Sequence, residues 1–261
     1  MKLIRTALLA TAAIALPAAP AMAQAEEAAT PGNLVTSEEL TEGEKLTALF
    51  AESDERSLAL NPISGLFRGD TRRADRLGDF LTDSFFIAAR TDTQLNMALL
   101  EQIDRSQLSE TDALAYDVFK YNQEQSLKGS TEEIRALTEV RPVNHFSGFH
   151  TFYPTFASGQ SAAQFKTVTD YENNLSRHDD YIAIGDRAID KFRNGMESGV
   201  LETSLTIDRV IKQLDTQLVV PLEDSQFWAP VRAMPEDFSE EDKARLTQEY
   251  REKTQAIYDS N

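Results

Sequence analysis

Apolar residues recur at intervals of three and four along most of this chain, and no stretch of useful length alternates strictly between apolar and polar positions. Such spacing places the apolar residues on one face of an α-helix. The expected helices start at polar residues that can cap them or stop near glycine or proline. They run from Thr41 to Asn61, from Asp70 toward Ile103, from Ser109 to Gly129, from Ser130 onward as a short helix, from Thr167 or Thr169 to Gly199, from Ile207 to Pro221 and from Ser239 to Ile257. The sequence therefore predicts an all-α fold, a multi-helix array of long antiparallel helices.

Two of these helices carry apolar stripes that assign an inward face. In the helix that starts at Asp70, the stripe consists of Leu77, Phe80, Leu81 and Phe85. In the helix that ends at Gly199, the longest, it consists of Tyr171, Leu175, Ile182, Ile189, Phe192 and Met196. We expect these side chains to face the core.

One segment breaks the helical pattern and is predicted to be a long aromatic-rich loop. Arg141 to Gly159 contains two histidines, four phenylalanines and one tyrosine. Aromatic side chains in irregular backbone must be buried under neighbouring helices or line a cleft where an organic ligand can stack. A packed loop is the favoured reading, and a cleft wall stays open. The candidates for substrate contact are His145, Phe149, His150 and Tyr153.

Composition limits the classes of partner. The chain carries 43 acidic and 26 basic side chains, a formal charge of −17, and this field repels phosphate groups. We therefore expect no nucleic-acid partner and no binding to an anionic membrane surface. The absence of cysteine excludes disulfides, thiol nucleophiles and cysteine-ligated zinc.

The N-terminus has the features of a cleavable signal peptide. Lys2 and Arg5 precede an apolar run too short to span a membrane, and Ala21-Met-Ala23 supplies small residues for cleavage after Ala23. Cleavage leaves 24 basic against 43 acidic side chains, a formal charge of −19. The predicted organisation is a signal peptide at 1–23, a flexible leader at 24–35 and a helical domain at 36–261, in a periplasmic or secreted protein without a stable membrane anchor.

Catalytic motifs are missing from the sequence. The only imidazoles are those of His145, His150 and His178, and none is followed by glutamate as a His-Glu-x-x-His zinc motif requires. His178 lies mid-helix and is interpreted as a surface or interhelix hydrogen bonder. Gly-x-Ser-x-Gly, phosphate-loop and Gly-x-Gly-x-x-Gly motifs are also absent. No residue is nominated as catalytic or as a metal ligand, and no cofactor is expected in this chain.

Several short motifs, in order, resemble a known bacterial family. They are Asn61-Pro-Ile-Ser-Gly-Leu-Phe-Arg-Gly-Asp70, Arg73-Ala-Asp-Arg-Leu77, His145-Phe-Ser-Gly-Phe-His150, Asp170-Tyr-Glu-Asn-Asn-Leu-Ser-Arg177, Arg193-Asn-Gly-Met-Glu-Ser-Gly199 and Ser225-Gln-Phe-Trp-Ala-Pro230. Together they resemble the bacterial domain-of-unknown-function family 885. Members are exported, largely helical proteins about twice this length, and their distal half carries a His-Glu-x-x-Pro-Gly-His-His type motif similar to a gluzincin zinc site.

The resemblance implies a function for the whole family fold. This chain would be the N-terminal part of a larger helical zincin-like fold, forming a wall of the substrate channel in a zinc-dependent peptidase-like hydrolase and lacking the catalytic motif. Its partners would be the missing C-terminal half and a peptide substrate. An amphipathic helix still running at Ile257 agrees with a truncated domain. The alternative is a non-catalytic periplasmic helical binding or scaffold protein.

Overall fold

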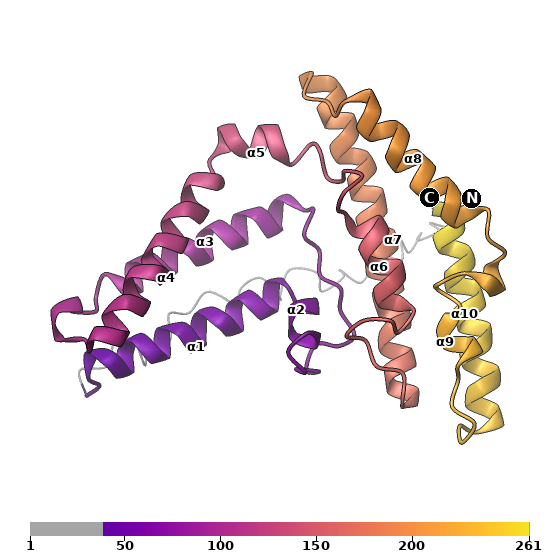
Figure 1. Cartoon of the computed structure of the whole chain (residues 1–261), viewed down its shortest axis with the longest axis horizontal. Coiled ribbons are helices and arrows are strands. Elements are labelled where there is room, and N and C mark those ends of the chain that lie inside the picture. Colours follow the sequence, from indigo (N-terminus) through magenta and orange to yellow (C-terminus); the bar gives the residue numbers. More distant parts are fainter. Residues whose placement is uncertain (1–38, 261) are drawn as a thin grey trace, which may run out of the picture. The chain divides into compact units, whose positions relative to one another are not determined.

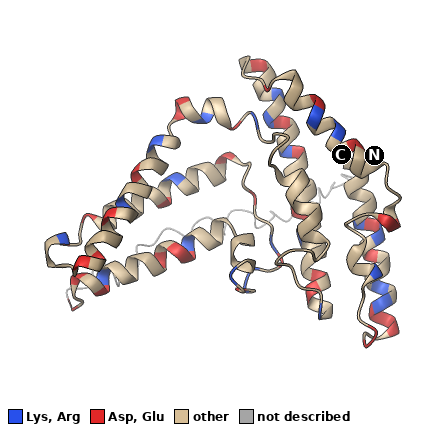
Figure 2. Cartoon of the chain, in the orientation of Figure 1, with Lys and Arg blue, Asp and Glu red and all other residues tan. Residues whose placement is uncertain are grey.

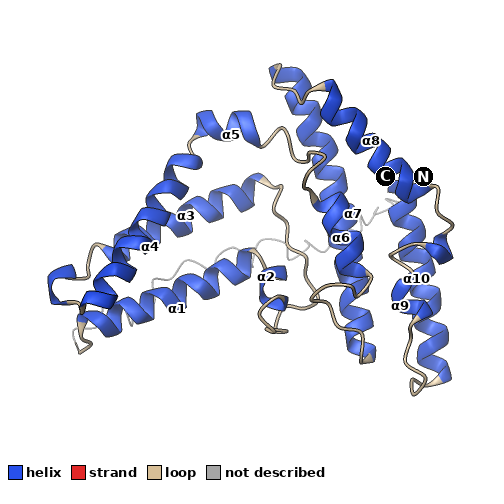
Figure 3. Ribbon diagram, viewed as in Figure 1, coloured by secondary structure: helices blue, strands red, loops and turns tan. Residues whose placement is uncertain are grey.

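The structure, a computed structural model, describes residues 39–260, which form helices and loops without any strand (Figure 3). The α-helices, labelled in Figure 1, are α1 (Glu42–Leu60), α2 (Ile63–Leu66), α3 (Asp83–Leu100), α4 (Glu110–Gly129), α5 (Glu132–Thr138), α6 (Phe149–Ala157), α7 (Val168–Ser198), α8 (Ser204–Leu218), α9 (Ala229–Arg232) and α10 (Glu240–Ser260). Two short 3₁₀ helices are η1 (Arg105–Gln107) and η2 (Leu222–Asp224). The all-α prediction is confirmed. The predicted signal peptide and leader lie outside the described residues.

Helix starts follow the capping residues that the sequence offers. The Thr41 hydroxyl accepts a hydrogen bond from the backbone N–H of Glu44, whose carboxylate accepts one from the backbone of Thr41, so α1 begins with a capping box. Thr167 and Asp170 form the same arrangement at the start of α7. That helix ends at Gly199, whose φ of +75° suits glycine. These boundaries agree with the prediction.

Helices α1, α3 and α4 pack as an antiparallel set around a core of leucines, Ile103 and Tyr116. Arg56 of α1 pairs with Asp92 of α3, and Asn96 of α3 donates to Gln123 of α4 at 3.3 Å. Arg56 also donates to Asn96 at 2.5 Å, so polar contacts connect the three helices along one side of their core.

Helices α7 and α10 run parallel, unlike the predicted antiparallel arrangement. Arg245 near the start of α10 pairs with Glu172 near the start of α7 at 2.8 Å, and Lys253 further along pairs with Asp179. The connection explains the direction. Helix α8 returns along part of α7, and residues 219–239 complete the return, so α10 starts at the same end as α7.

The helix predicted from Asp70 begins only at Asp83, and the intervening residues are irregular. Polar side chains of α7 bind the backbone of this segment. The carboxylate of Asp180 accepts a hydrogen bond from the Leu77 N–H at 2.8 Å, and Arg177 donates to the Ala74 carbonyl. Leu77 is still buried, as predicted, but Gly78 has a φ of +96° that a helix does not allow.

The inward face of α7 also differs from the predicted stripe near its C-terminal end. Ile189 and Met196 are 42% and 72% exposed, whereas Ile184 and Ala188 are buried. The predicted stripe places Ile189 and Met196 seven and fourteen residues after Ile182, a strict seven-residue spacing. A straight α-helix rotates such a stripe by about 20° per heptad, so these residues turn away from the core.

The surface carries both signs of charge. Acidic and basic residues are interspersed along the helices rather than segregated on separate elements (Figure 2). Within residues 39–260, no helix combines the length and apolar character needed to cross a membrane.

Candidate functional site

The aromatic segment is only partly a loop, because Phe149–Ala157 forms helix α6. The interior Pro154 made a helix difficult to predict here. Proline has no N–H to donate to the carbonyl four residues earlier, which is that of His150. In the structure, the side chain of Gln217 on α8 donates to this carbonyl at 3.0 Å. A side chain from another helix thus satisfies the acceptor that the proline leaves unpaired.

The loop before α6 is held by α8 as well. The Gln213 amide donates to the backbone carbonyl of His145 at 3.0 Å, and its Oε1 lies 3.0 Å from His150 Nε2. The His145 ring accepts from Arg209 at 3.0 Å. Gly148 sits where a Cβ would lie 2.7 Å from the His150 ring, so this close approach requires glycine. Both histidines of the segment are therefore engaged by protein groups.

Tyr153 is fully buried in the core of α6 and α7. Its hydroxyl lies 2.7 Å from Nδ1 of His178, and its ring stacks on Tyr181 with centroids 4.5 Å apart. Burial raises the pKa of Tyr153 and lowers the pKa of His178 to about 3. Tyr153 therefore donates to a neutral imidazole. His178 is an interhelix hydrogen bonder, as one of the two sequence interpretations held, and it has no exposed surface.

The four candidate contacts thus lie in different environments. His150 is buried, Phe149 packs edge-on against Tyr181 with centroids 5.7 Å apart, and Tyr153 offers no surface to a ligand. His145 lies in the loop bound to α8. Their role as substrate contacts stays a prediction.

Sequence reasoning did not single out an aromatic surface formed by Phe67, Phe152 and Phe156. Phe67 at the end of α2 is 55% exposed and Phe152 on α6 is 39% exposed, with ring centroids 6.3 Å apart. Both rings contact the fully buried Phe156, at 5.9 and 5.6 Å. The spacing of Phe152 and Phe156 on one helical face was the available signal. We call these three rings the aromatic surface.

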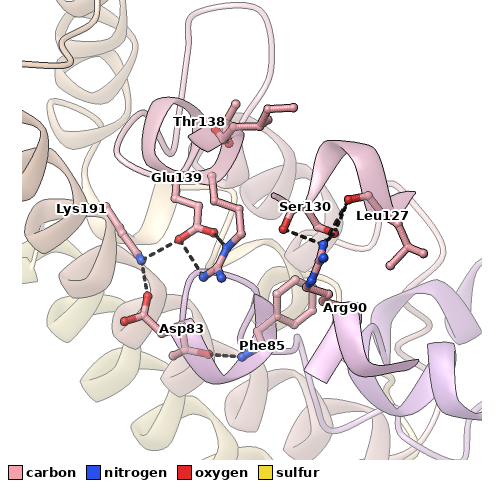
Figure 4. Close-up of polar contacts among 11 residues, drawn as sticks. Asp83, Phe85, Arg90, Leu127, Ser130, Thr138, Glu139 and Lys191 are labelled. Carbon is pink, nitrogen blue, oxygen red and sulfur yellow. Dashed lines mark hydrogen bonds and ion pairs between the residues drawn. The ribbon is translucent and has the colours of Figure 1, made fainter. Parts of the chain in front are cut away.

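A polar cavity of about 230 Å³ lies between α3, α4 and α5. Figure 4 shows two groups of contacts there. Arg90 donates to the carbonyls of Leu127 and Ser130, at 3.1 and 3.0 Å, and to the Ser130 hydroxyl at 2.8 Å. In the second group, Glu139 accepts from Arg135 and from Lys191 of α7, the latter at 3.3 Å.

Lys191 also pairs with Asp83 at 2.7 Å, and this hydrogen bond lowers the pKa of the Asp83 carboxyl. Hydrogen bonding to Glu139 raises the pKa of Arg135. A larger groove of about 610 Å³ lies between α1 and α4, with Phe50, Leu114 and Val118 among its lining residues.

The described residues do not fit the zinc ion that the family resemblance implies. Within 39–260, no group of three histidine, aspartate or glutamate side chains is arranged to hold a metal. His145, His150 and His178 instead contact Arg209, Gln213 and Tyr153, one partner each.

Comparison with known proteins identifies the family. The sequence profile described as "Bacterial protein of unknown function (DUF885)" matches residues 62–260. The chain belongs to this family. The resemblance seen in the sequence motifs is thereby confirmed, while the description of DUF885 assigns no activity. No curated protein and no solved structure matches the chain.

Replacing Tyr153 by phenylalanine should destabilise the protein by about 1–3 kcal/mol, because the buried His178 Nδ1 loses its hydrogen bond. Urea denaturation measures the change. Tyr121→Phe, at a tyrosine that is 61% exposed, is the matched control and should change stability little. Equal stability of Y153F and wild type would contradict the burial of this pair.

Stability should also fall as pH decreases below about 6.5, because unfolded His178 binds a proton that the folded protein excludes down to about pH 3. The expected slope from this group approaches about 1.4 kcal/mol per pH unit within that window. Comparing wild type with His178→Gln between pH 7.5 and 5 isolates the contribution. Parallel stability curves for the two proteins would show that His178 is not buried as a neutral group.

Proposed function

We propose that this chain is the helical portion of an exported, zinc-dependent peptidase-like hydrolase, and that its aromatic surface forms part of the wall along which a peptide substrate lies. Membership in DUF885 supports the assignment to the family fold. The gluzincin-like motif of the resemblance supports the reaction class. In this proposal the metal and the general base come from the distal part of the family fold, and the described helices bind and orient the substrate.

The observation that carries the proposal is the exposed pair Phe67 and Phe152 on a rigid base. Phe156 beneath them is fully buried, and the Arg177 guanidinium lies 5.3 Å from its ring centroid. Large aromatic side chains left exposed in a fixed geometry are typical of recognition surfaces. They can stack on apolar side chains of an extended peptide, while the acidic chain attracts basic ones.

The loop from Val143 to Gly148 would complete this wall. Phe146 at its tip is 85% exposed, next to the His145 ring at a centroid distance of 4.0 Å. Gln213 of α8 holds the backbone of the loop at His145. A loop held in this way presents Phe146 at low entropic cost when a ligand binds.

Binding of a fluorescein-labelled ten-residue peptide of alternating Phe and Lys tests the aromatic surface directly. Phe67→Ala and Phe152→Ala should each weaken binding about 2–10-fold in fluorescence anisotropy, because one aromatic contact is lost. Val219→Ala, at an apolar residue 79% exposed beyond α8, is the control and should bind as wild type does. Equal weakening in all three variants, or in none, would contradict the proposal.

The coding sequence after the codon for Asn261 separates an enzyme portion from a binding or scaffold protein. An in-frame His-Glu-x-x-Pro-Gly-His-His motif supports the proposed hydrolase. A stop codon followed by no such frame would favour the non-catalytic alternative, even where the peptide binds.

A further inference from the structure

The cavity between α3, α4 and α5 combines groups that suit a small anion. Its lining residues are Phe86, Ala89, Arg90, Thr93, Ser126, Gly129, Ser130, Arg135, Thr138 and Glu139. They supply two guanidinium groups and several hydroxyls beside the apolar surface of Phe86 and Ala89. The Phe86 ring also lies 5.3 Å from the Arg135 guanidinium and 5.5 Å from the Lys191 ammonium, measured to its centroid.

Arg90 is a cation without a counter-ion in the described part of the chain. All of its hydrogen bonds there leave from Nη1 and end on carbonyl or hydroxyl oxygens of Leu127 and Ser130. These acceptors belong to the C-terminal end of α4, which a guanidinium stabilises. Its Nε and Nη2 make no hydrogen bond to residues 39–260, and a guanidinium offers donors in a fork that matches an oxyanion.

The single carboxylate in the cavity lining does not neutralise Arg90. Glu139 accepts from both Arg135 and Lys191, and Lys191 is shared with Asp83. The cavity and this adjoining network therefore contain the cations Arg90, Arg135 and Lys191 against the carboxylates of Glu139 and Asp83. The excess positive charge stays with Arg90, on the opposite group of contacts in Figure 4.

This local excess contrasts with the rest of the molecule. A formal charge of −17 repels anions in general, so an anion that binds must be held by a particular arrangement of donors. A volume of about 230 Å³ accommodates about eight waters at ~30 Å³ each, which corresponds to a small organic acid rather than a peptide or nucleotide.

We propose that this cavity binds a small organic anion through a carboxylate or phosphate group, with the free donors of Arg90 forming a forked contact and the hydroxyls of Ser126 and Thr138 lining the rest of the site. The site is separate from the aromatic surface and does not depend on the proposed hydrolase function. Bound anion would connect the end of α4 to α5 by neutralising Arg90.

The test uses sodium succinate and sodium phosphate as probes, each titrated into the whole chain by calorimetry at constant ionic strength set with sodium chloride. At least one probe should bind with one site per chain. Succinate alone would indicate a carboxylate ligand, and phosphate alone a phosphorylated one. Binding of neither at 10 mM or above, as an order-of-magnitude limit for a useful site, would overturn the proposal.

Variants locate the site. Arg90→Gln should weaken binding by about tenfold or more, because a charge-assisted forked contact is lost. Ser126→Glu introduces a carboxylate into the cavity from an exposed helical position, so it should pair with Arg90, keep the fold and abolish binding even where R90Q is unstable. Arg141→Gln is the matched control, because Arg141 also donates to a helix carbonyl, that of Leu137, without lining the cavity.

Wild-type affinity in R141Q together with the loss in R90Q and S126E is the expected pattern. Unchanged affinity in S126E, or equal weakening in R90Q and R141Q, would show that anions bind by general attraction and would overturn the site.

Discussion

A row of buried polar side chains on one face of α7 is the constraint on which the arrangement of its neighbours depends. Asn174, Arg177 and His178 occupy little more than one turn and are almost completely excluded from solvent. Burial lowers the pKa of Arg177, and taking a guanidinium out of water costs several kcal/mol unless its donors are satisfied. Here the Ala74 carbonyl and the Asn174 side chain accept from it. Residues from elsewhere in the chain must therefore reach α7 before its burial becomes favourable.

Each partner of this row fixes a different part of the fold. Ala74 belongs to the irregular segment before α3, Tyr153 belongs to α6, and Tyr250 of α10 accepts from Asn174 at 3.0 Å. Because hydrogen bonds are directional, these contacts set the position of each segment along α7 more narrowly than apolar packing would. The exposed aromatic rings of the candidate site are carried by α6 and the end of α2, so they inherit this rigidity.

Local sequence signals were sufficient for features that depend on neighbouring residues. The capping boxes at Thr41 and Thr167 place helix starts because both partners lie three residues apart. The signals failed where a distant residue decides the conformation. The segment before Asp83 has apolar spacing suited to a helix, yet Asp180 and Arg177 bind its backbone from α7. Tertiary contacts of this kind override local propensity.

The site shows the same division. An unusual density of aromatic residues correctly drew attention to residues 141–159, but helix α6 was not predictable because the partner of the His150 carbonyl is Gln217, far along the chain. Nor could spacing alone distinguish Tyr153, which is buried, from Phe152, which is exposed one residue earlier. Arg90 gave no signal at all, since its lack of a counter-ion is a property of three helices together.

Native-state hydrogen exchange tests most directly whether the polar row of α7 organises its neighbours. The Leu77 amide lies in irregular backbone but donates to Asp180, and the amides of α6 and α10 depend on the same helix. The account predicts that the Leu77 amide, α6 and α10 exchange with the same free energy of opening as the centre of α7, as one cooperative unit. Rapid exchange of Leu77, or opening of α6 well before α7, would contradict it.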